Sequence, residues 1–264
     1  MKEVSTADLG FLANSLIEFP PRFMEPVFVG TRPSSLLPRA FNGTATLLCL
    51  SGRYFAVTCF HVLEEFRRIR ESVRDAVFQI GHLELDPELY LLSESSEVDL
   101  AVLEIHDHQI DEGVVVSIGE PPNKLRKSRF HEPAVWPPAA AKKEDIISFA
   151  GFPGSWRNPT GPASMDMFIF SHGATMVESA GAAHFYSRLE LDKCEGVTFF
   201  DKEIDNIGGL SGGPVFAWKR DELQAQLLGI IIEYQENYDL LYIRSTRLLL
   251  ENGTLLSEME VPPP

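Results

Sequence analysis

The 264-residue sequence contains only three cysteines, Cys49, Cys59 and Cys194. So odd and sparse a set does not form a disulfide framework, which excludes a small disulfide-stabilised scaffold. Basic residues are also few: 23 lysines and arginines stand against 38 aspartates and glutamates, for a formal net charge of -15. This balance argues against a protein that binds nucleic acid through its phosphates, and equally against one that binds an anionic membrane surface.

Long hydrophobic runs are missing as well. No stretch reaches the ~18 consecutive apolar residues of a membrane span. The start of the chain carries an acid at Glu3 and lacks the apolar run of a signal peptide. We therefore expect a cytoplasmic protein with reduced thiols. Hydrophobic residues make up 44% and charged residues 23%, both near the globular average, so bulk disorder is excluded.

Composition divides the chain into three parts. Residues 1–40 begin with a helical pattern over Ser5–Glu18 and continue into a proline-rich stretch, so we interpret them as an N-terminal extension. The segment Pro121–Lys143 combines prolines with lysines and arginines and is typical of a linker. We therefore expect one structural unit over residues 41–135 and a second over residues 136–264.

Short strand-like runs dominate both units. Thr44–Leu50 and Tyr54–Phe60 flank Ser51-Gly52-Arg53 and predict a β-hairpin, and the same style of short apolar run recurs after the linker. Val62–Val77 has a helical pattern, and a final helix is expected over Ser245–Glu251. The pattern indicates an all-β protein of barrels or sandwiches.

The strongest chemical signal is the segment Gly208–Phe216, in which Ser211 is bracketed by glycine pairs. Glycines permit positive φ angles and the close approach of a substrate backbone. Taken alone, the segment also fits a tight turn with a solvated serine. A serine hydroxyl is a poor nucleophile, so a catalytic serine needs a base, and the base needs an orienting group.

Two residues of the first unit are candidates for these roles. His61 follows an apolar strand and begins the helical segment, and Asp99 precedes the apolar run Leu100–Ile105. Each has an alternative interpretation when taken alone: a buried structural histidine, and a solvated acid at the end of a strand.

These segments resemble a known family. Thr58-Cys59-Phe60-His61, Asp99-Leu100-Ala101-Val102-Leu103 and Gly209-Leu210-Ser211-Gly212-Gly213-Pro214 are similar to the three signature blocks of trypsin-like serine peptidases, in the order His, Asp, Ser. The resemblance covers about residues 41–250. It implies two six-stranded antiparallel β-barrels of the chymotrypsin fold, with a short N-terminal helical extension and a C-terminal helix.

The resemblance also implies roles for single residues. Ser211 would be the nucleophile, His61 the base and Asp99 its orienting group, with the backbone N–H groups of Gly209 and Ser211 forming an oxyanion hole. No cofactor or metal is expected. Leu210 stands where digestive relatives have the aspartate that pairs with a new N-terminus. Together with the sparse cysteines, this places the chain nearer to bacterial intracellular or HtrA-like members, without a PDZ domain.

Specificity and regulation can be read only through the same resemblance. Asp205, Ile232 and Tyr234 are candidates for the specificity pocket. At the position of Asp205, six residues before the serine, the trypsin branch has the aspartate that recognises Arg or Lys. The alternative is a surface loop acid, and Tyr234 stands where cation-specific relatives have a small residue.

The expected function is that of a serine endopeptidase acting on a protein or peptide substrate. By resemblance to standalone bacterial members, it would be a regulated effector in a prokaryotic stress or anti-phage system, controlled by a protein that contacts residues 1–40. The alternative is a peptidase-fold module that binds a partner and is latent or catalytically silent.

Overall fold

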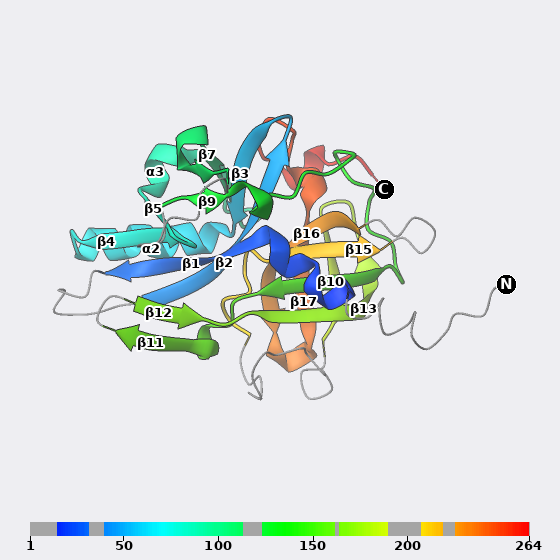
Figure 1. Cartoon of the computed structure of the whole chain (residues 1–264). Helices are drawn as coiled ribbons and strands as arrows, with labels where there is room; N and C mark the ends of the chain where they lie inside the picture. Colours follow the sequence, from blue (N-terminus) through cyan, green and yellow to red (C-terminus); the bar gives the residue numbers. More distant parts are fainter. Residues whose placement is uncertain are drawn as a thin grey trace.

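The computed structural model describes residues 15–31, 40–112, 123–161, 164–189, 207–218 and 225–263. The first half of the chain is built on a seven-stranded antiparallel sheet with the strand order β5-β4-β1-β2-β3-β7-β6 (Figure 1). In chain order its strands are β1 (Met24–Thr31), β2 (Ala40–Leu50), β3 (Arg53–Thr58), β4 (Ala76–Ile80), β5 (Leu83–Leu85), β6 (Leu91–Ser95) and β7 (Leu100–Ile105).

The second half contains a closed six-stranded barrel in which the strands follow the order β10-β13-β14-β17-β16-β15. Antiparallel pairing of β10 with β15 closes the ring. The barrel strands are β10 (Ile146–Gly151), β13 (Phe170–Ala180), β14 (His184–Arg188), β15 (Pro214–Trp218), β16 (Ala225–Gln235) and β17 (Leu240–Ser245). Two small pairs lie outside these sheets: β8 (Ile110–Asp111) with β9 (Leu125–Arg126), and β11 (Arg157–Gly161) with β12 (Ser164–Met167).

Helices are few and short. The longest, α2 (Phe60–Ser72), packs its buried residues Val62, Leu63, Phe66 and Ile69 into the core of the first sheet. A shorter α-helix is α3 (Pro87–Tyr90). Short 3-10 helices span Pro20–Phe23, Asp107–Gln109, Lys127–Arg129, Gly154–Trp156, Glu236–Tyr238, Thr246–Leu248 and Glu258–Glu260.

Strand β2 lies between the two halves and is buried on both faces from Asn42 to Leu50. Because side chains alternate along a strand, its two faces meet different surroundings. Ala45, Leu47 and Cys49 join the core of the first sheet. Leu48 and Leu50 join a second apolar cluster, which also contains residues of the barrel and of the C-terminal segment. Strand β2 therefore carries contacts from one half to the other.

The hairpin predicted around Ser51-Gly52-Arg53 is confirmed, because β2 pairs with β3 from Leu50 opposite Arg53 to Thr46 opposite Val57. The all-β, chymotrypsin-like class is also confirmed. The two halves differ, however: the first sheet remains open, and only the second closes into a six-stranded barrel.

Both ends of the chain differ in detail from the expectations. Met24–Thr31, assigned to the extension, is strand β1, which pairs with β2 and β4 inside the first sheet. The sheet half therefore begins before residue 41. Of the helix expected over Ser5–Glu18, residues 15–18 are helical and the rest lies outside the described residues. The expected C-terminal helix is reduced to the 3-10 turn Thr246–Leu248.

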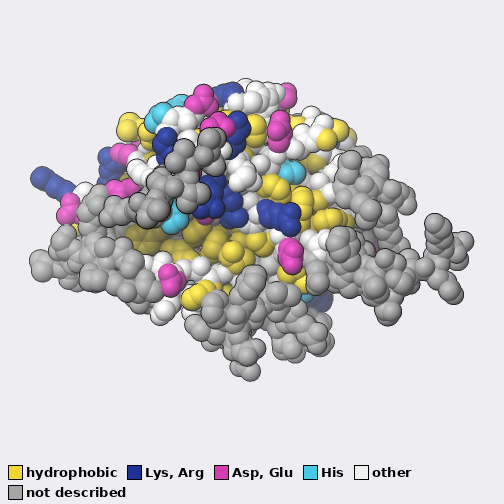
Figure 2. Space-filling view, in the orientation of Figure 1, with side chains coloured by type: hydrophobic (Ala, Val, Ile, Leu, Met, Phe, Trp, Pro, Cys, Tyr) yellow, Lys and Arg dark blue, Asp and Glu magenta, His cyan; other side chains and the backbone are white. Residues whose placement is uncertain are grey.

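Positive and negative side chains are interspersed over the upper part of the face shown in Figure 2, above a band of hydrophobic side chains. Salt bridges pair several charged side chains of the sheet half: Arg67 on α2 contacts Glu88 and Glu94, and Arg53 contacts Glu104. Within the described part of the chain, no helix is long and apolar enough to cross a membrane.

Candidate active site

His61 and Asp99 form a direct side-chain pair in the sheet half. The Nδ1 atom of His61 lies 2.8 Å from Oδ2 of Asp99, and the second carboxylate oxygen, Oδ1, accepts the backbone N–H of His61 at 3.0 Å. The two side chains are 39% and 26% exposed, so the imidazole is reachable from solvent while the carboxylate lies behind it. This contact holds the ring orientation and favours the tautomer whose Nδ1 carries the proton.

The local fold explains why the two residues meet. His61 is the second residue of α2, whose N-cap residue Cys59 provides no side-chain hydrogen bond to the N–H groups of the helix. The first N–H groups of a helix lack partners within the helix, and a negative charge is favourable there. Asp99, which has a φ of 54°, reaches across from the start of β7 and provides that acceptor. One carboxylate thus caps the helix and orients the histidine.

Ser211 lies in a loop whose carbonyl groups are all engaged from Gly208 to Gly212. The carbonyl of Gly208 accepts from Gly154 N–H, that of Leu210 from Gly213 N–H, and that of Ser211 from Thr44 N–H. Two hydroxyl groups of β2 complete the set, Thr44 Oγ1 to Gly209 at 2.9 Å and Thr46 Oγ1 to Gly212 at 2.7 Å. The backbone of this loop is therefore held by both halves of the molecule.

The N–H groups of the same loop fall into two sets. Those of Leu210, Gly212 and Gly213 donate to Ile207, Ile231 and Leu210. Those of Gly209 and Ser211 donate to no group in the part of the chain that the structure describes. They are the two N–H groups expected to form an oxyanion hole, and they remain available to an incoming oxygen atom.

Glycine is required at two positions of this loop. Gly209 has a φ of 103°, and a Cβ atom there would lie 2.5 Å from both Asn42 Nδ2 and the carbonyl oxygen of Phe152. Gly212 has a φ of 94°, and its Cβ would lie 1.8 Å from the carbonyl oxygen of Thr44. Both the left-handed conformation and the close backbone approach exclude a side chain.

The Ser211 hydroxyl makes a different contact from the one expected of a catalytic triad. Its Oγ donates to the carbonyl oxygen of Ile232 on β16 at 3.1 Å, and no hydrogen bond joins it to His61 among the described residues. The His61–Asp99 contact expected of a triad is therefore present, whereas the Ser211 hydroxyl bonds to a carbonyl of the barrel strand β16.

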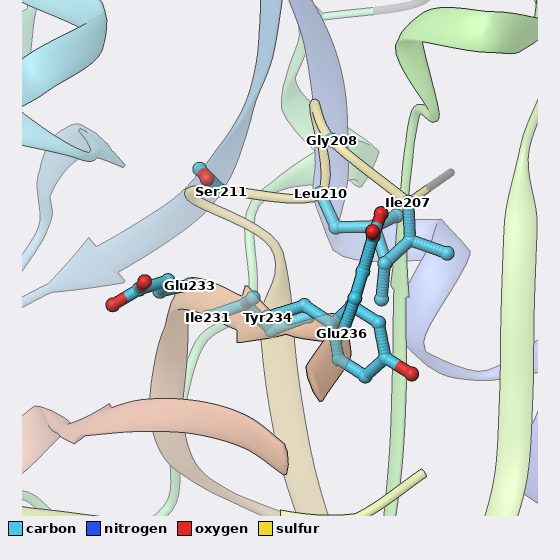
Figure 3. Close-up of a pocket in the computed structure, with 8 residues that line it drawn as sticks. All are labelled: Ile207, Gly208, Leu210, Ser211, Ile231, Glu233, Tyr234 and Glu236. Carbon is cyan, nitrogen blue, oxygen red and sulfur yellow. The ribbon is translucent and has the colours of Figure 1, made fainter. Parts of the chain in front are cut away.

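A small pocket of about 110 Å³ opens beside Ser211. Its apolar lining residues are Ile207, Leu210 and Ile231, and the polar ones include Glu233, Tyr234 and Glu236. In Figure 3, Ser211 and Glu233 lie on one side of the pocket and Tyr234 and Glu236 on the other. The Tyr234 hydroxyl contacts the Leu189 carbonyl and Asp239 Oδ1, both at 3.1 Å, which holds the ring in place.

The three residues expected to form the specificity pocket have different locations. Tyr234 lines the pocket beside Ser211, whereas Ile232 contributes its carbonyl to Ser211 and packs its side chain against two apolar clusters. Asp205 lies outside the described residues. The two glutamates of the pocket were not identified from the sequence. The signal for Glu233 is the run Ile232-Glu233-Tyr234, where an acid interrupts an apolar strand, and Glu236 follows three residues later.

Cys59 adjoins the same pair, since its Sγ lies within 4.8 Å of the ligand atoms of His61 and Asp99. Three such groups could hold a metal ion, but the environment opposes it. Burial, and secondarily the charge of Asp99, raise the pKa of the Cys59 thiol well above its ordinary value. Since the thiolate is the form that binds metals, the protonated thiol disfavours a metal here. It donates instead to the Ile231 carbonyl at 3.3 Å.

No model of a known protein family matches the chain, and no curated protein matches it. Among solved structures, the chain is similar to catalytically inactive tobacco etch virus protease in complex with substrate. The match has 11% sequence identity and a TM-score of 0.40, and covers 88% of this chain and 79% of that one. So distant a likeness assigns no residue roles. The topology itself, an open sheet and a closed six-stranded barrel, agrees with the chymotrypsin-like fold class expected from the sequence.

Proposed function

We propose that this protein is a serine endopeptidase that hydrolyses peptide bonds in a protein or peptide substrate. The observation that carries the proposal is the geometry around Ser211. A histidine oriented by a carboxylate lies in one half, and the serine in the other is flanked by two N–H groups with no partner in the described chain. A nucleophile, a base with its orienting group and oxyanion donors are the parts that acyl transfer requires.

The mechanism follows from these parts. Ser211 Oγ attacks the scissile carbonyl carbon as its proton passes to Nε2 of His61, and the N–H groups of Gly209 and Ser211 stabilise the resulting oxyanion. The C–N bond then breaks, and His61 returns the proton to the leaving amine, which leaves an acyl-enzyme. Water, activated by His61, hydrolyses that ester. Asp99 stabilises the imidazolium at both stages.

We propose that one rearrangement precedes this cycle: the Ser211 side chain rotates, so that its hydroxyl leaves the Ile232 carbonyl and turns toward His61. The loop backbone keeps its hydrogen bonds in this step, because the carbonyl groups from Gly208 to Gly212 all have partners already.

Covalent labelling with a fluorophosphonate tests the proposal. The wild-type protein should be labelled at Ser211, and Ser211→Ala should abolish labelling because the attacking oxygen is gone. The exposed Ser72→Ala on α2 is the matched control and should be labelled like the wild type. Labelling of Ser211→Ala at the wild-type rate would contradict the assignment of the nucleophile.

The orientation of Ser211 favours a second candidate, a latent or silent peptidase-fold module that binds a partner. In that case the wild-type protein would resist labelling while its fold stays intact. Adding a partner that switches labelling on would identify a latent enzyme, and binding without labelling would identify a silent module.

Regulation through the N-terminal extension, as in a prokaryotic stress or anti-phage effector, is part of the same proposal. The structure limits where it can be tested. Residue Leu16 is buried, Ser171 Oγ donates to the Ile17 carbonyl, and β1 is a strand of the sheet. Deletion should therefore be restricted to residues 2–14. A labelling rate and partner binding unchanged by that deletion would count against a regulatory role for the extension.

A further inference from the structure

Thr44 occupies the position from which strand β2 contacts the loop of the candidate nucleophile. Its side chain is fully buried, and its hydroxyl makes two hydrogen bonds across the boundary between the halves. Thr44 Oγ1 donates to the Gly209 carbonyl at 2.9 Å and accepts the Phe152 N–H at 3.1 Å. Its backbone N–H also donates to the Ser211 carbonyl at 2.8 Å.

The first contact acts on one side of Gly209. A glycine has no side chain to restrict its rotation, so neighbouring groups must hold its two peptide planes. The plane that follows Gly209 contains the carbonyl bonded to Thr44 Oγ1. That bond fixes ψ of Gly209.

The second contact acts on the other side, through a turn of the barrel half. The plane that precedes Gly209 contains the Gly208 carbonyl, which accepts the N–H of Gly154. Gly154 belongs to the turn that starts at Phe152, and the Phe152 N–H donates to Thr44 Oγ1. Asn42 Nδ2 holds the same turn through the Phe152 carbonyl at 2.7 Å.

Rotation of the Gly208–Gly209 peptide plane would exchange an N–H donor for a carbonyl oxygen at the place where the oxyanion forms. A carbonyl there repels negative charge, whereas an N–H stabilises it. The contacts of Thr44 oppose this rotation from both sides of Gly209.

We propose that Thr44 is a positioning residue that holds the Gly208–Gly209 and Gly209–Leu210 peptide planes and so keeps the oxyanion hole formed. The inference rests on the proposed serine peptidase activity and adds a residue that touches neither substrate nor nucleophile side chain. It also makes the sheet half contribute to oxyanion stabilisation, in addition to His61 and Asp99.

Thr44→Val tests this role, because valine keeps the β-branched shape and removes the hydroxyl. The second-order rate of fluorophosphonate labelling should fall by about 10–100-fold, a fraction of the 10²–10³-fold cost of losing a whole oxyanion donor. Thr44→Ser restores the hydroxyl and should return the rate to within about threefold of the wild type, a rescue expected when the hydrogen bonds matter.

Thr246→Val is the matched control. Thr246 is also buried, and its hydroxyl donates to the Leu227 carbonyl at 2.8 Å, apart from the loop of Ser211. It should lower the melting temperature in the manner of Thr44→Val and leave the labelling rate unchanged. Equal rates for Thr44→Val and the wild type, or equal losses for both threonine variants, would overturn the proposal.

A further variant keeps the test decisive if Thr44→Val does not fold. Thr44→Cys has a smaller side chain and a weaker hydrogen-bonding group, so a rate at least fivefold below the wild type is expected in folded protein. A Thr44→Cys rate equal to the wild type would contradict the positioning role. The failure of wild-type protein to label at all would instead count against the peptidase activity on which the inference rests.

Discussion

The two halves of the molecule position their residues of the candidate site through different kinds of group. In the sheet half the contribution is made by side chains: the Asp99 carboxylate contacts the His61 imidazole at 2.8 Å and the His61 backbone N–H at 3.0 Å. In the barrel half the contribution is backbone: the carbonyl groups from Gly208 to Gly212 are bonded, and among the described residues the N–H groups of Gly209 and Ser211 donate to no group. The Ser211 side chain alone is directed elsewhere.

This difference shows which part of the site can change easily. A flip of the loop backbone must break several buried hydrogen bonds, each costly to leave unmade. Rotation of a serine side chain exchanges one hydrogen bond for another and crosses only a torsional barrier. In this arrangement, the Gly209 and Ser211 N–H groups donate to no described group, and the Ser211 hydroxyl can change its partner by side-chain rotation.

The largest effect is expected from separating the side-chain pair of the sheet half. Asp99→Asn keeps an acceptor for the helix N–H but removes the charge and favours the wrong histidine tautomer. The labelling rate at Ser211 should fall by about 10⁴-fold, the order found when the corresponding change is made in a serine protease triad. Fluorophosphonate kinetics at pH 7.5 measure it.

Asp86→Asn is the control for this change, because Asp86 also accepts a helix N–H, that of Glu88 at 3.2 Å, away from the site. It should leave the labelling rate unaltered. A wild-type rate for Asp99→Asn would show that the Asp–His contact does not serve catalysis.

The next effect concerns the backbone of the barrel half. Gly209→Ala places a methyl group against Asn42 and the Phe152 carbonyl at a φ of 103°. The loop must move, so the labelling rate should fall by about 10²–10³-fold, as when an oxyanion donor is lost. Gly52→Ala is a matched control, since Gly52 has a φ of 76° and open space at its Cβ.

Gly52→Ala should lower the free energy of unfolding by about 1–2 kcal/mol through backbone strain, which appears as a lower melting temperature, with no change in labelling. Loss of activity in both variants would attribute the effect to general destabilisation, and not to the position of Gly209.

The smallest effect is expected at the junction of the halves. The backbone of His131 forms hydrogen bonds with β2, and its ring packs against Phe19, Phe23 and Phe216. Burial lowers the pKa of His131 to about 4. The unfolded chain takes up this proton near pH 6.5 and the folded chain does not. The contribution of neutral His131 to the free energy of unfolding is therefore fully present above pH 6.5. It is lost as the pH decreases toward 4, by about 3 kcal/mol in total.

His131→Phe keeps an aromatic ring and removes the titrating group. Urea unfolding at pH 7 and pH 4 should show a smaller acid-induced loss than in the wild type, by up to about 3 kcal/mol. The exposed His82→Gln serves as the control. An unchanged loss in His131→Phe would place the acid sensitivity within the separate halves, and not at their junction.

Several elements could be predicted because their signals are local. The β2–β3 hairpin follows from two apolar runs around a turn. The positive φ angles at Gly209 and Gly212 follow from the glycines, because other residues rarely adopt such angles. The helix predicted over Val62–Val77 is real but runs from Phe60 to Ser72, and Val77 belongs to β4. Boundaries depend on caps and packing more than on periodicity.

Strand β1 was not predicted from the sequence, for a different reason. Its residues include Pro26 and lie in a proline-rich stretch, which favours an extension over a central strand. The strand forms because Val27 and Val29 are buried in the core between β2 and β4. Long-range pairing thus outweighed the local signal.

The sequence by itself determined which chemical groups are available: a histidine at a strand–helix junction, an aspartate before a strand, and a serine between glycines. Only the tertiary structure decided their relations. Thr44 donates to the carbonyl of Gly209, 165 positions away, and the Ser211 hydroxyl donates to the Ile232 carbonyl and not to His61. The physical reason is that spacing specifies candidates for hydrogen bonding, whereas distance and angle between packed strands decide which bonds are made.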